Sequence, residues 1–166
     1  MLELVITIVL AIILVSLAMV VSLATIQRGR TRGVAHEIQS MTQLARMEAV
    51  SRNRECLVLL SPEAGQVMVT DGLGTLASND DILLREAKLP SSVAFMRPDP
   101  GSSINWESLG GSPAWFRLVF SADGTVASGD GDIFLKGGEN YERLSIFVSG
   151  STRVWSWKEG AWQVGG

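Results

Sequence analysis

The feature that most constrains this chain is an uncharged, apolar run at its start. Residues 4–27 carry no charge, and residues 4–26 are interrupted only by Thr7, Ser16, Ser22 and Thr25. As a helix these 23 residues would rise about 34 Å, enough to cross a hydrocarbon core of about 30 Å. A secretory signal peptide, the alternative, has a shorter apolar core of about 7–15 residues after a basic start. The run therefore predicts a membrane span over residues 1–27.

Three arginines, Arg28, Arg30 and Arg32, follow the apolar run at once. Basic residues at the end of a span face lipid phosphates, so these side chains are predicted to form a membrane-interface anchor. Membrane lipid is accordingly expected as a partner.

A second helical pattern starts just after these arginines. The apolar residues of this stretch fall within about 60° of one line on a helix of 3.6 residues per turn, namely Val34, Ile38, Met41, Ala45 and Ala49. No proline occurs before Pro62. One long helix over roughly residues 2–53 is predicted, with a membrane half (1–27) and an amphipathic half (28–54).

The period changes to that of strands from residue 56 onward. Strands are predicted at 56–60, 66–70, 82–89, 93–96, 114–120, 133–135, 144–148 and 153–157, with a short edge strand around Trp162 and Val164. Residues 71–81 and 97–113 are expected to be loops, and Asp123-Gly124 a hairpin turn. The fold class is α+β: a long N-terminal helix packed on an antiparallel β-sheet head formed by 55–166.

Composition excludes several kinds of site. The single cysteine, Cys56, allows no intramolecular disulfide or cysteine zinc cage, and the single histidine, His36, allows no His-rich metal site. Cys56 opens an apolar strand, which is typical of a small buried hydrophobe. No nucleophile motif accompanies His36. We therefore expect no enzyme activity, no cofactor, no metal and no small-molecule substrate.

Acidic and aromatic residues of the head each have two interpretations. Asp80-Asp81 and the run 129–132 resemble calcium loops, but they lack EF-hand spacing, and turn chemistry explains them better. Trp155 and Trp157 share one strand face, where they would either stack nucleic-acid bases or cover the sheet; the second interpretation is favoured.

Glu3 stands at the front of the apolar run, far from any basic residue. Its carboxylate would either lie in the headgroup layer or be a functional intramembrane charge, because an unpaired charge in lipid is costly.

A family resemblance favours the functional interpretation. The start Glu3-Leu4-Val5-Ile6-Thr7-Ile8 resembles the start of mature type IV pilins and pseudopilins, which reads Phe-Thr-Leu-Leu-Glu-Leu. The stretch 44–53 is similar to the helix-end motif of the GspH/FimT pseudopilins. The segments 120–124, 133–135 and 145–148 follow the C-terminal pattern of the same family. The resemblance spans nearly the whole chain.

The resemblance implies an assembly function. Family precursors carry a short basic leader that a prepilin peptidase removes before it methylates the new amine. The glutamate five residues into the mature chain pairs with that amine on a neighbouring subunit and sets the register of a helical filament, and Glu3 matches it. Other pilins or pseudopilins are therefore the implied partners, and the head is expected in the periplasm, on a single inner-membrane span.

The chain departs from the family pattern at its start. The leader and the cleavage glycine are absent, and two further residues before Met1 are needed to make Glu3 the fifth; a late start codon or trimming would account for this. Arg28, Arg30 and Arg32 after the span would by themselves place the head in the cytoplasm. A basic leader would oppose that placement.

Two functions follow from the resemblance. The first is a minor pseudopilin, a structural subunit of a type II secretion system. The alternative is a FimT-like minor pilin in pilus assembly or DNA uptake, whose heads carry a Gly-Arg-x-Arg turn. The matching turn here, residues 150–153, keeps only Arg153, and residues 55–166 have a net charge of −6. Nucleic-acid binding needs clustered basic residues, so the charge argues against a nucleic-acid partner.

Overall fold

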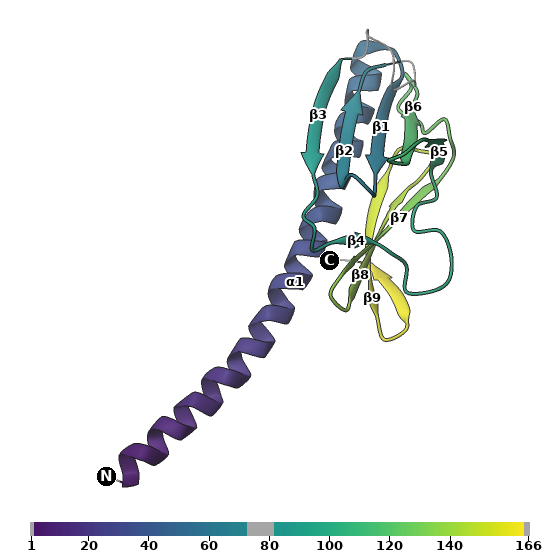
Figure 1. Ribbon diagram of the computed structural model, residues 1–166. Coiled ribbons are helices and arrows are strands. Elements are labelled where there is room, and N and C mark those ends of the chain that lie inside the picture. The colour runs from purple at the N-terminus through teal and green to yellow at the C-terminus, as the bar shows by residue number, and fades with distance from the viewer. Residues whose placement is uncertain (1, 73–81, 165–166) are drawn as a thin grey trace.

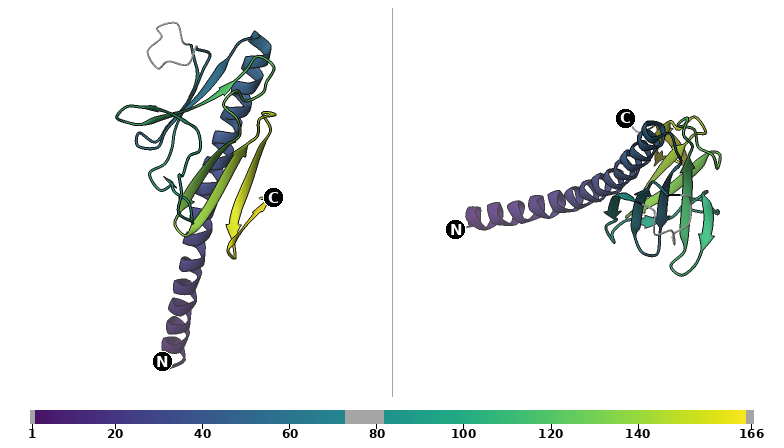
Figure 2. Two further views of the ribbon diagram at one scale, coloured as in Figure 1. Left: turned by 90° about the vertical axis from the view of Figure 1, so that its right-hand side faces the viewer. Right: turned by 90° about the horizontal axis from the view of Figure 1, so that it is seen from above.

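The computed structural model describes residues 2–72 and 82–164. Helix α1 (Leu2–Arg52) has 51 residues and is about 76 Å long at 1.5 Å per residue. Its second half lies against the head, and its first half projects away from it (Figures 1 and 2). The continuous helix confirms the expectation drawn from the absence of proline.

The helix ends within one residue of the predicted position. Asn53 adopts a left-handed conformation with φ of 50°, which asparagine tolerates. Its N–H bonds the Val50 carbonyl at 3.3 Å, and the Arg54 N–H bonds the Ala49 carbonyl at 3.1 Å. This pair of bonds satisfies the last helical carbonyls in a Schellman arrangement.

The predicted amphipathic face is the one that packs. Val34, Ile38, Met41, Ala45 and Ala49 are all buried. Thr31, Ala35 and Thr42 are buried as well, so the contact face is wider than the apolar stripe alone. Small and hydroxyl side chains at these positions let strands come close to the helix axis.

The described residues of the head form two five-stranded antiparallel sheets. The first has the order β3-β2-β1-β6-β5, from Leu83–Lys88, Gln66–Thr70, Cys56–Ser61, Trp115–Phe120 and Glu107–Gly110. The second has the order β10-β9-β8-β7-β4, from Ala161–Val164, Thr152–Lys158, Asn140–Ile146, Gly131–Gly137 and Ala94–Phe95. Each pair of neighbours is antiparallel.

The core lies where the helix meets both sheets. Ile38 and Met41 of the helix, Leu60 of β1, and Leu144 and Ile146 of β8 belong to one buried cluster and are each fully buried. Burying such a side chain contributes about 1.5–3 kcal/mol. One hydrophobic core therefore holds the helix and both sheets together.

Two expectations need correction. The stretch 97–113 is not all loop, because it contains β5, which pairs with β6 through an irregular register at Ser108 and Gly110. The Asp123-Gly124 turn forms, with φ of 80° at Gly124, but Val126 makes only one isolated bridge to Phe120. The chain then enters the second sheet, so this turn is a corner between sheets.

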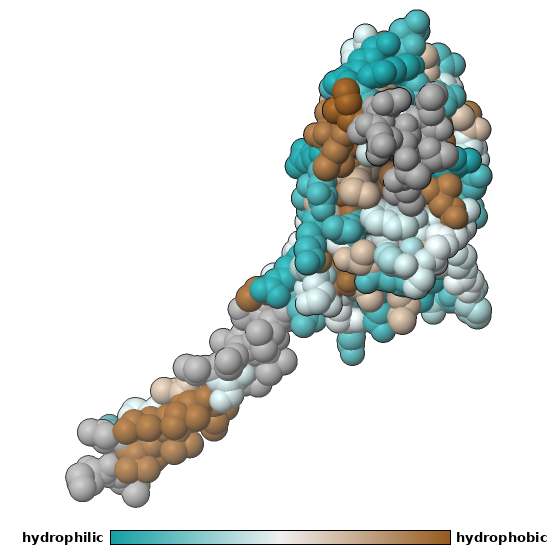
Figure 3. Space-filling model, turned by 45° about the horizontal axis from the view of Figure 1, so that its top comes forward, coloured by the Kyte–Doolittle hydropathy of each residue, from teal (hydrophilic) through white to brown (hydrophobic). Residues whose placement is uncertain are grey.

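Apolar side chains gather on the free part of the helix (Figure 3). Among the residues whose side chains the structure describes, seven between residues 5 and 13 are about half exposed, namely Val5, Ile6, Ile8, Val9, Leu10, Ile12 and Ile13. Among the residues that the structure describes, no helix is both long enough and apolar enough to traverse a bilayer. The division of the chain at residues 27 and 54 stays a prediction.

Candidate functional site

Glu3 lies in the first turn of α1, with an exposed side chain. The helix dipole favours a carboxylate at this end. The start of the helix is the part of the chain farthest from the head (Figure 1), so the head cannot supply a partner for this charge. Its role in filament register stays a prediction.

The three predicted anchor arginines divide between two faces of the helix. Arg28 and Arg32 are four residues apart and therefore lie on one side. Both line a pocket of about 170 Å³ between the helix and the ends of β8 and β9. Arg30 is exposed and is not part of that lining. The arginines were predicted as one cluster, whereas the structure brings only two of them to the head.

The β7–β8 hairpin contacts the helix in the same turns that carry these arginines. Gly137 packs on Thr31 so closely that a Cβ there would overlap the Thr31 hydroxyl, and a Cβ on Gly138 would overlap the Gln27 side chain. The Arg28 Nε also donates to Asn140 Oδ1 at 3.0 Å. The hairpin backbone thus packs directly on helix side chains, with no flexible joint between hairpin and helix.

A second contact of the same kind lies near the end of the helix. Arg46 Nε donates to the Gly124 carbonyl at 3.1 Å. Gly124 and Gly150 both have positive φ and both pack on the Arg46 side chain. Gln39 adds a bond from its Nε2 to Thr152 Oγ1 at 3.0 Å. The turn of residues 150–153 is therefore partly occupied in holding the helix.

Asp71 joins the helix end to the first sheet. Its fully buried carboxylate accepts hydrogen bonds from the Ile82 N–H at 2.9 Å, from Arg52 at 2.6 Å and from Arg54. Burial alone would raise the pKa of Asp71, but the Ile82 hydrogen bond and the charges of Arg54 and Arg52 outweigh it and lower the pKa. Asp71 stays ionised and bridges two segments of the chain.

Glu142 is a buried carboxylate that sequence reasoning missed. It is 3% exposed, and the Ser156 hydroxyl lies 2.8–2.9 Å from its two oxygens. Burial raises the pKa of Glu142, and the Ser156 bond and the charges of Arg32 and His36 offset only part of that rise. The sequence did contain a sign of this burial. Glu142 is two residues before Leu144 and four before Ile146, so it lies on the same strand face as these two apolar residues.

Three tryptophans of β9 and β10 lie on the face of the second sheet that is turned away from the helix, namely Trp155, Trp157 and Trp162. Trp157 and Trp162 are 5.1 Å apart, centroid to centroid, and Phe134 lies 5.5 Å from Trp162. The guanidinium of Arg153 lies 5.5 Å above the Trp155 ring. Arg153 itself is exposed. Aromatic packing within the sheet is thus the role observed for these rings.

The other sequence candidates have structural partners. Cys56 is fully buried, as predicted, and burial raises the pKa of its thiol. Asp130 accepts the Val148 N–H at 2.7 Å, and Asp132 binds both Arg143 and Ser145. His36 is exposed, with Nδ1 3.0 Å from Gln39 Oε1. Asp80 and Asp81 lie outside the described residues.

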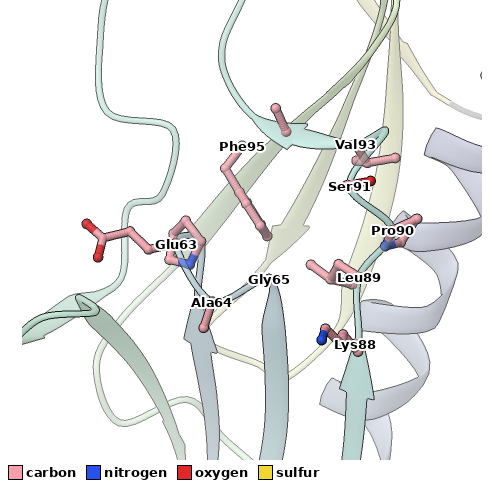
Figure 4. A pocket seen from close by; sticks show the side chains of 11 residues that line it. Glu63, Ala64, Gly65, Lys88, Leu89, Pro90, Ser91, Val93 and Phe95 are labelled. Carbon is pink, nitrogen blue, oxygen red and sulfur yellow. The ribbon is translucent and has the colours of Figure 1, made fainter.

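A larger groove, of about 460 Å³, separates the two sheets on one side of the head. The β1–β2 turn, the β3–β4 connection and β4 form it, and its lining is mostly apolar. In Figure 4 the side chains of Phe95 and Leu89 lie on opposite sides of the groove. The Glu63 carboxylate points away from Phe95. Glu63 instead accepts the Ala114 N–H at 3.2 Å. Within the described chain, the groove contains no arrangement of groups for catalysis.

The described molecule is therefore a long helix fixed to a head of two sheets. The charged residues predicted to act in assembly and membrane anchoring all lie on the helix and not in the groove of the head, namely Glu3, Arg28, Arg30 and Arg32. A family model described as type II transport protein GspH matches residues 34–152. The chain belongs to the GspH family. The match includes the helix from residue 34 onward, the whole first sheet, and strands β4, β7 and β8 of the second sheet. Glu3, the three anchor arginines and Arg153 lie outside it.

Solved structures confirm that the fold is that of GspH-like pilins. The type IV minor pilin FimU of Pseudomonas aeruginosa has a TM-score of 0.53 and 19% identity, covering 82% of this chain and 94% of that chain. The minor pseudopilin EpsH of the Vibrio cholerae type 2 secretion system has a TM-score of 0.51 and 12% identity, covering 76% and 97%. No curated protein matches the chain significantly.

Proposed function

We propose that this chain is a minor pseudopilin, a structural subunit of a type II secretion pseudopilus that takes part in protein secretion across the outer membrane. The observation that carries the proposal is the GspH family match over residues 34–152. Its activity is assembly with other pilin-like subunits rather than chemistry. The rigid union of helix and head suits that role, because a force applied to the helix reaches the head without a hinge.

The proposal places the first half of α1 in the inner membrane and the head in the periplasm. The uncharged run of residues 4–27 supports a single span. The precursor would carry a basic leader that lies on the cytoplasmic side of the membrane. A prepilin peptidase would then remove this leader. Arg30, which faces away from the head, would contact lipid phosphates at the opposite interface.

Glu3 would set the register of the filament. A carboxylate surrounded by apolar helices is costly unless a positive group neutralises it. The methylated N-terminal amine of a neighbouring subunit is such a group. Pairing the two would fix the axial step between subunits.

The test compares Glu3→Ala with Glu37→Ala in cells that express the major subunit. Glu37 is a helix glutamate beyond the span, so the control removes the same charge elsewhere on the helix. We expect Glu3→Ala to keep a folded head and normal membrane insertion but to lose crosslinking to the major subunit. Unchanged crosslinking would show that Glu3 does not set the register.

DNA uptake is the second candidate function. Exposed Arg153, stacked on Trp155 beside the turn of residues 150–153, is the observation that favours it. Binding along the DNA backbone needs more clustered positive charge than this acidic head carries. The full chain in detergent should therefore not retard double-stranded DNA at physiological salt. Salt-sensitive retardation that Arg153→Ala removes would favour the uptake function instead.

A further inference from the structure

We propose that the 170 Å³ pocket between helix and head binds the phosphate of an anionic phospholipid headgroup. We call it the junction pocket. Arg28 and Arg32 line it from the helix, and Asn140, Tyr141, Trp157 and Lys158 line it from β8 and β9. The inference rests on the proposed membrane span and adds a structured lipid site that includes the sheet.

The cations of the junction pocket are not neutralised by ion pairs. Within the described chain, Arg32 and Lys158 make no salt bridge, and Arg28 bonds only the neutral amide of Asn140. Elsewhere on the head, arginines such as Arg117 and Arg143 are each paired with a carboxylate. Three unpaired cations converging on one opening are suited to an anion with several acceptor oxygens.

The place of the pocket indicates where that anion comes from. Its lining comes from Arg28 and Arg32 of the helix, from the start of β8 and from the end of β9. In Figures 1 and 2 the β7–β8 and β9–β10 hairpins lie beside the part of the helix that leaves the head. The uncharged helical run ends at residue 27, directly before Arg28. A pocket at this level faces the phosphates of the bilayer.

The acidic residues nearby do not fill the pocket. Glu142 lines it but is 3% exposed, and its carboxylate is hydrogen-bonded to Ser156. Glu139 and Glu159 stand at the turns of the two hairpins and are not part of the lining. The volume equals that of about five or six water molecules, which is suited to a phosphate group and excludes a macromolecule.

The experiment uses the full chain in nanodiscs of phosphatidylcholine with or without phosphatidylglycerol. Native mass spectrometry counts the lipids that remain bound after release from the disc. We compare Lys158→Ala and Arg32→Ala with Arg30→Ala, which removes the same charge two residues away outside the lining. Lys158 is exposed at a strand end, so its removal leaves the fold intact, and it decides the result if Arg32→Ala unfolds.

We expect the wild type to retain phosphatidylglycerol in preference to phosphatidylcholine. Lys158→Ala and Arg32→Ala should each lower that retention about tenfold, because each loses a charge-assisted hydrogen bond to the lipid phosphate. Arg30→Ala should lower that retention less than either of these variants does, because Arg30 contacts lipid phosphates only outside the pocket. An equal loss in all three variants would mean diffuse surface attraction and would overturn the pocket.

Three further outcomes are decisive. Displacement of the lipid by inorganic phosphate would make this a site for soluble phosphate and refute the lipid assignment. Insertion into the discs without preference for phosphatidylglycerol would refute the pocket alone. Failure of the wild type to insert would refute the membrane span, and the lipid site with it.

Discussion

Gly137→Ala tests whether helix and head are joined as rigidly as the structure indicates. A Cβ at residue 137 would overlap the Thr31 hydroxyl and come within 3.1 Å of the Thr31 Cβ. Neither side can move away easily, because Thr31 is fully buried on the helix and Gly137 is buried at the end of β7. Overpacking of this kind costs about 1–3 kcal/mol. The reduced freedom of the unfolded chain returns about 0.4–1 kcal/mol.

We therefore expect Gly137→Ala to lower the free energy of unfolding by about 1–2 kcal/mol. Thr31→Ala removes the closest atoms, so in that background the glycine substitution should cost less by about 1 kcal/mol. The measurement is denaturant unfolding of the full chain in detergent, with all four members of the double-mutant cycle.

Gly33→Ala is the control for the introduction of a methyl group. A Cβ at that helical position meets nothing within 4 Å, so the substitution should stabilise the chain by about 0.5–1 kcal/mol. If Gly137→Ala costs nothing, or costs the same with and without the Thr31 hydroxyl, the close contact between hairpin and helix does not exist in solution.

Three further substitutions test the core and the buried charges. Ile38→Ala should lower the free energy of unfolding by about 2–5 kcal/mol, because it opens a cavity between helix and sheets. Asp71→Asn should destabilise the chain at pH 7; the pKa of Asp71 is lowered from 3.8, so the difference from wild type is present above that value and disappears as the pH falls through the lowered pKa. For Glu142→Gln the expected dependence of stability on pH is the reverse of that for Asp71→Asn. The pKa of Glu142 is raised above 4.5, so wild-type stability declines as the pH rises through the raised pKa, whereas the glutamine variant should show no such decline in denaturant titrations at successive pH values.

The helix and its contact face could be predicted from the sequence. The 3.6-residue spacing of Val34, Ile38 and Met41 defines one buried stripe whatever lies against it. Strand β2 has the predicted bounds, 66–70, because its alternating pattern is bounded by turn residues on one side and Asp71 on the other. Local periodicity was enough for these elements.

The division into two sheets could not be predicted in the same way. Alternation reports which face of a strand is buried, but it does not identify the neighbouring strand. The corner at Gly124 has the residues of an ordinary hairpin, and β5 lies in a stretch rich in serine, glycine and proline. Both are decided by packing between distant parts of the chain.

Of the residues around the junction pocket, only Arg28 and Arg32 were predicted from the sequence to contact lipid, and they were grouped with Arg30. Residues four apart share one face of a helix, and residues two apart do not. This spacing alone could have indicated that Arg28 and Arg32 share a face of the helix whereas Arg30 lies on another. Lys158 could not be added from the sequence, because only the fold brings the end of β9 beside the helix. Glu142 likewise gains its meaning from the burial of β8 against α1.

The most direct test of the central claim is the mass and N-terminal sequence of the native protein isolated from membranes. The account predicts an N-methylated residue two positions before Met1, which would make Glu3 the fifth residue of a processed pseudopilin. An unmethylated chain that starts at Met1 would contradict processing by a prepilin peptidase and the role of Glu3 in the filament.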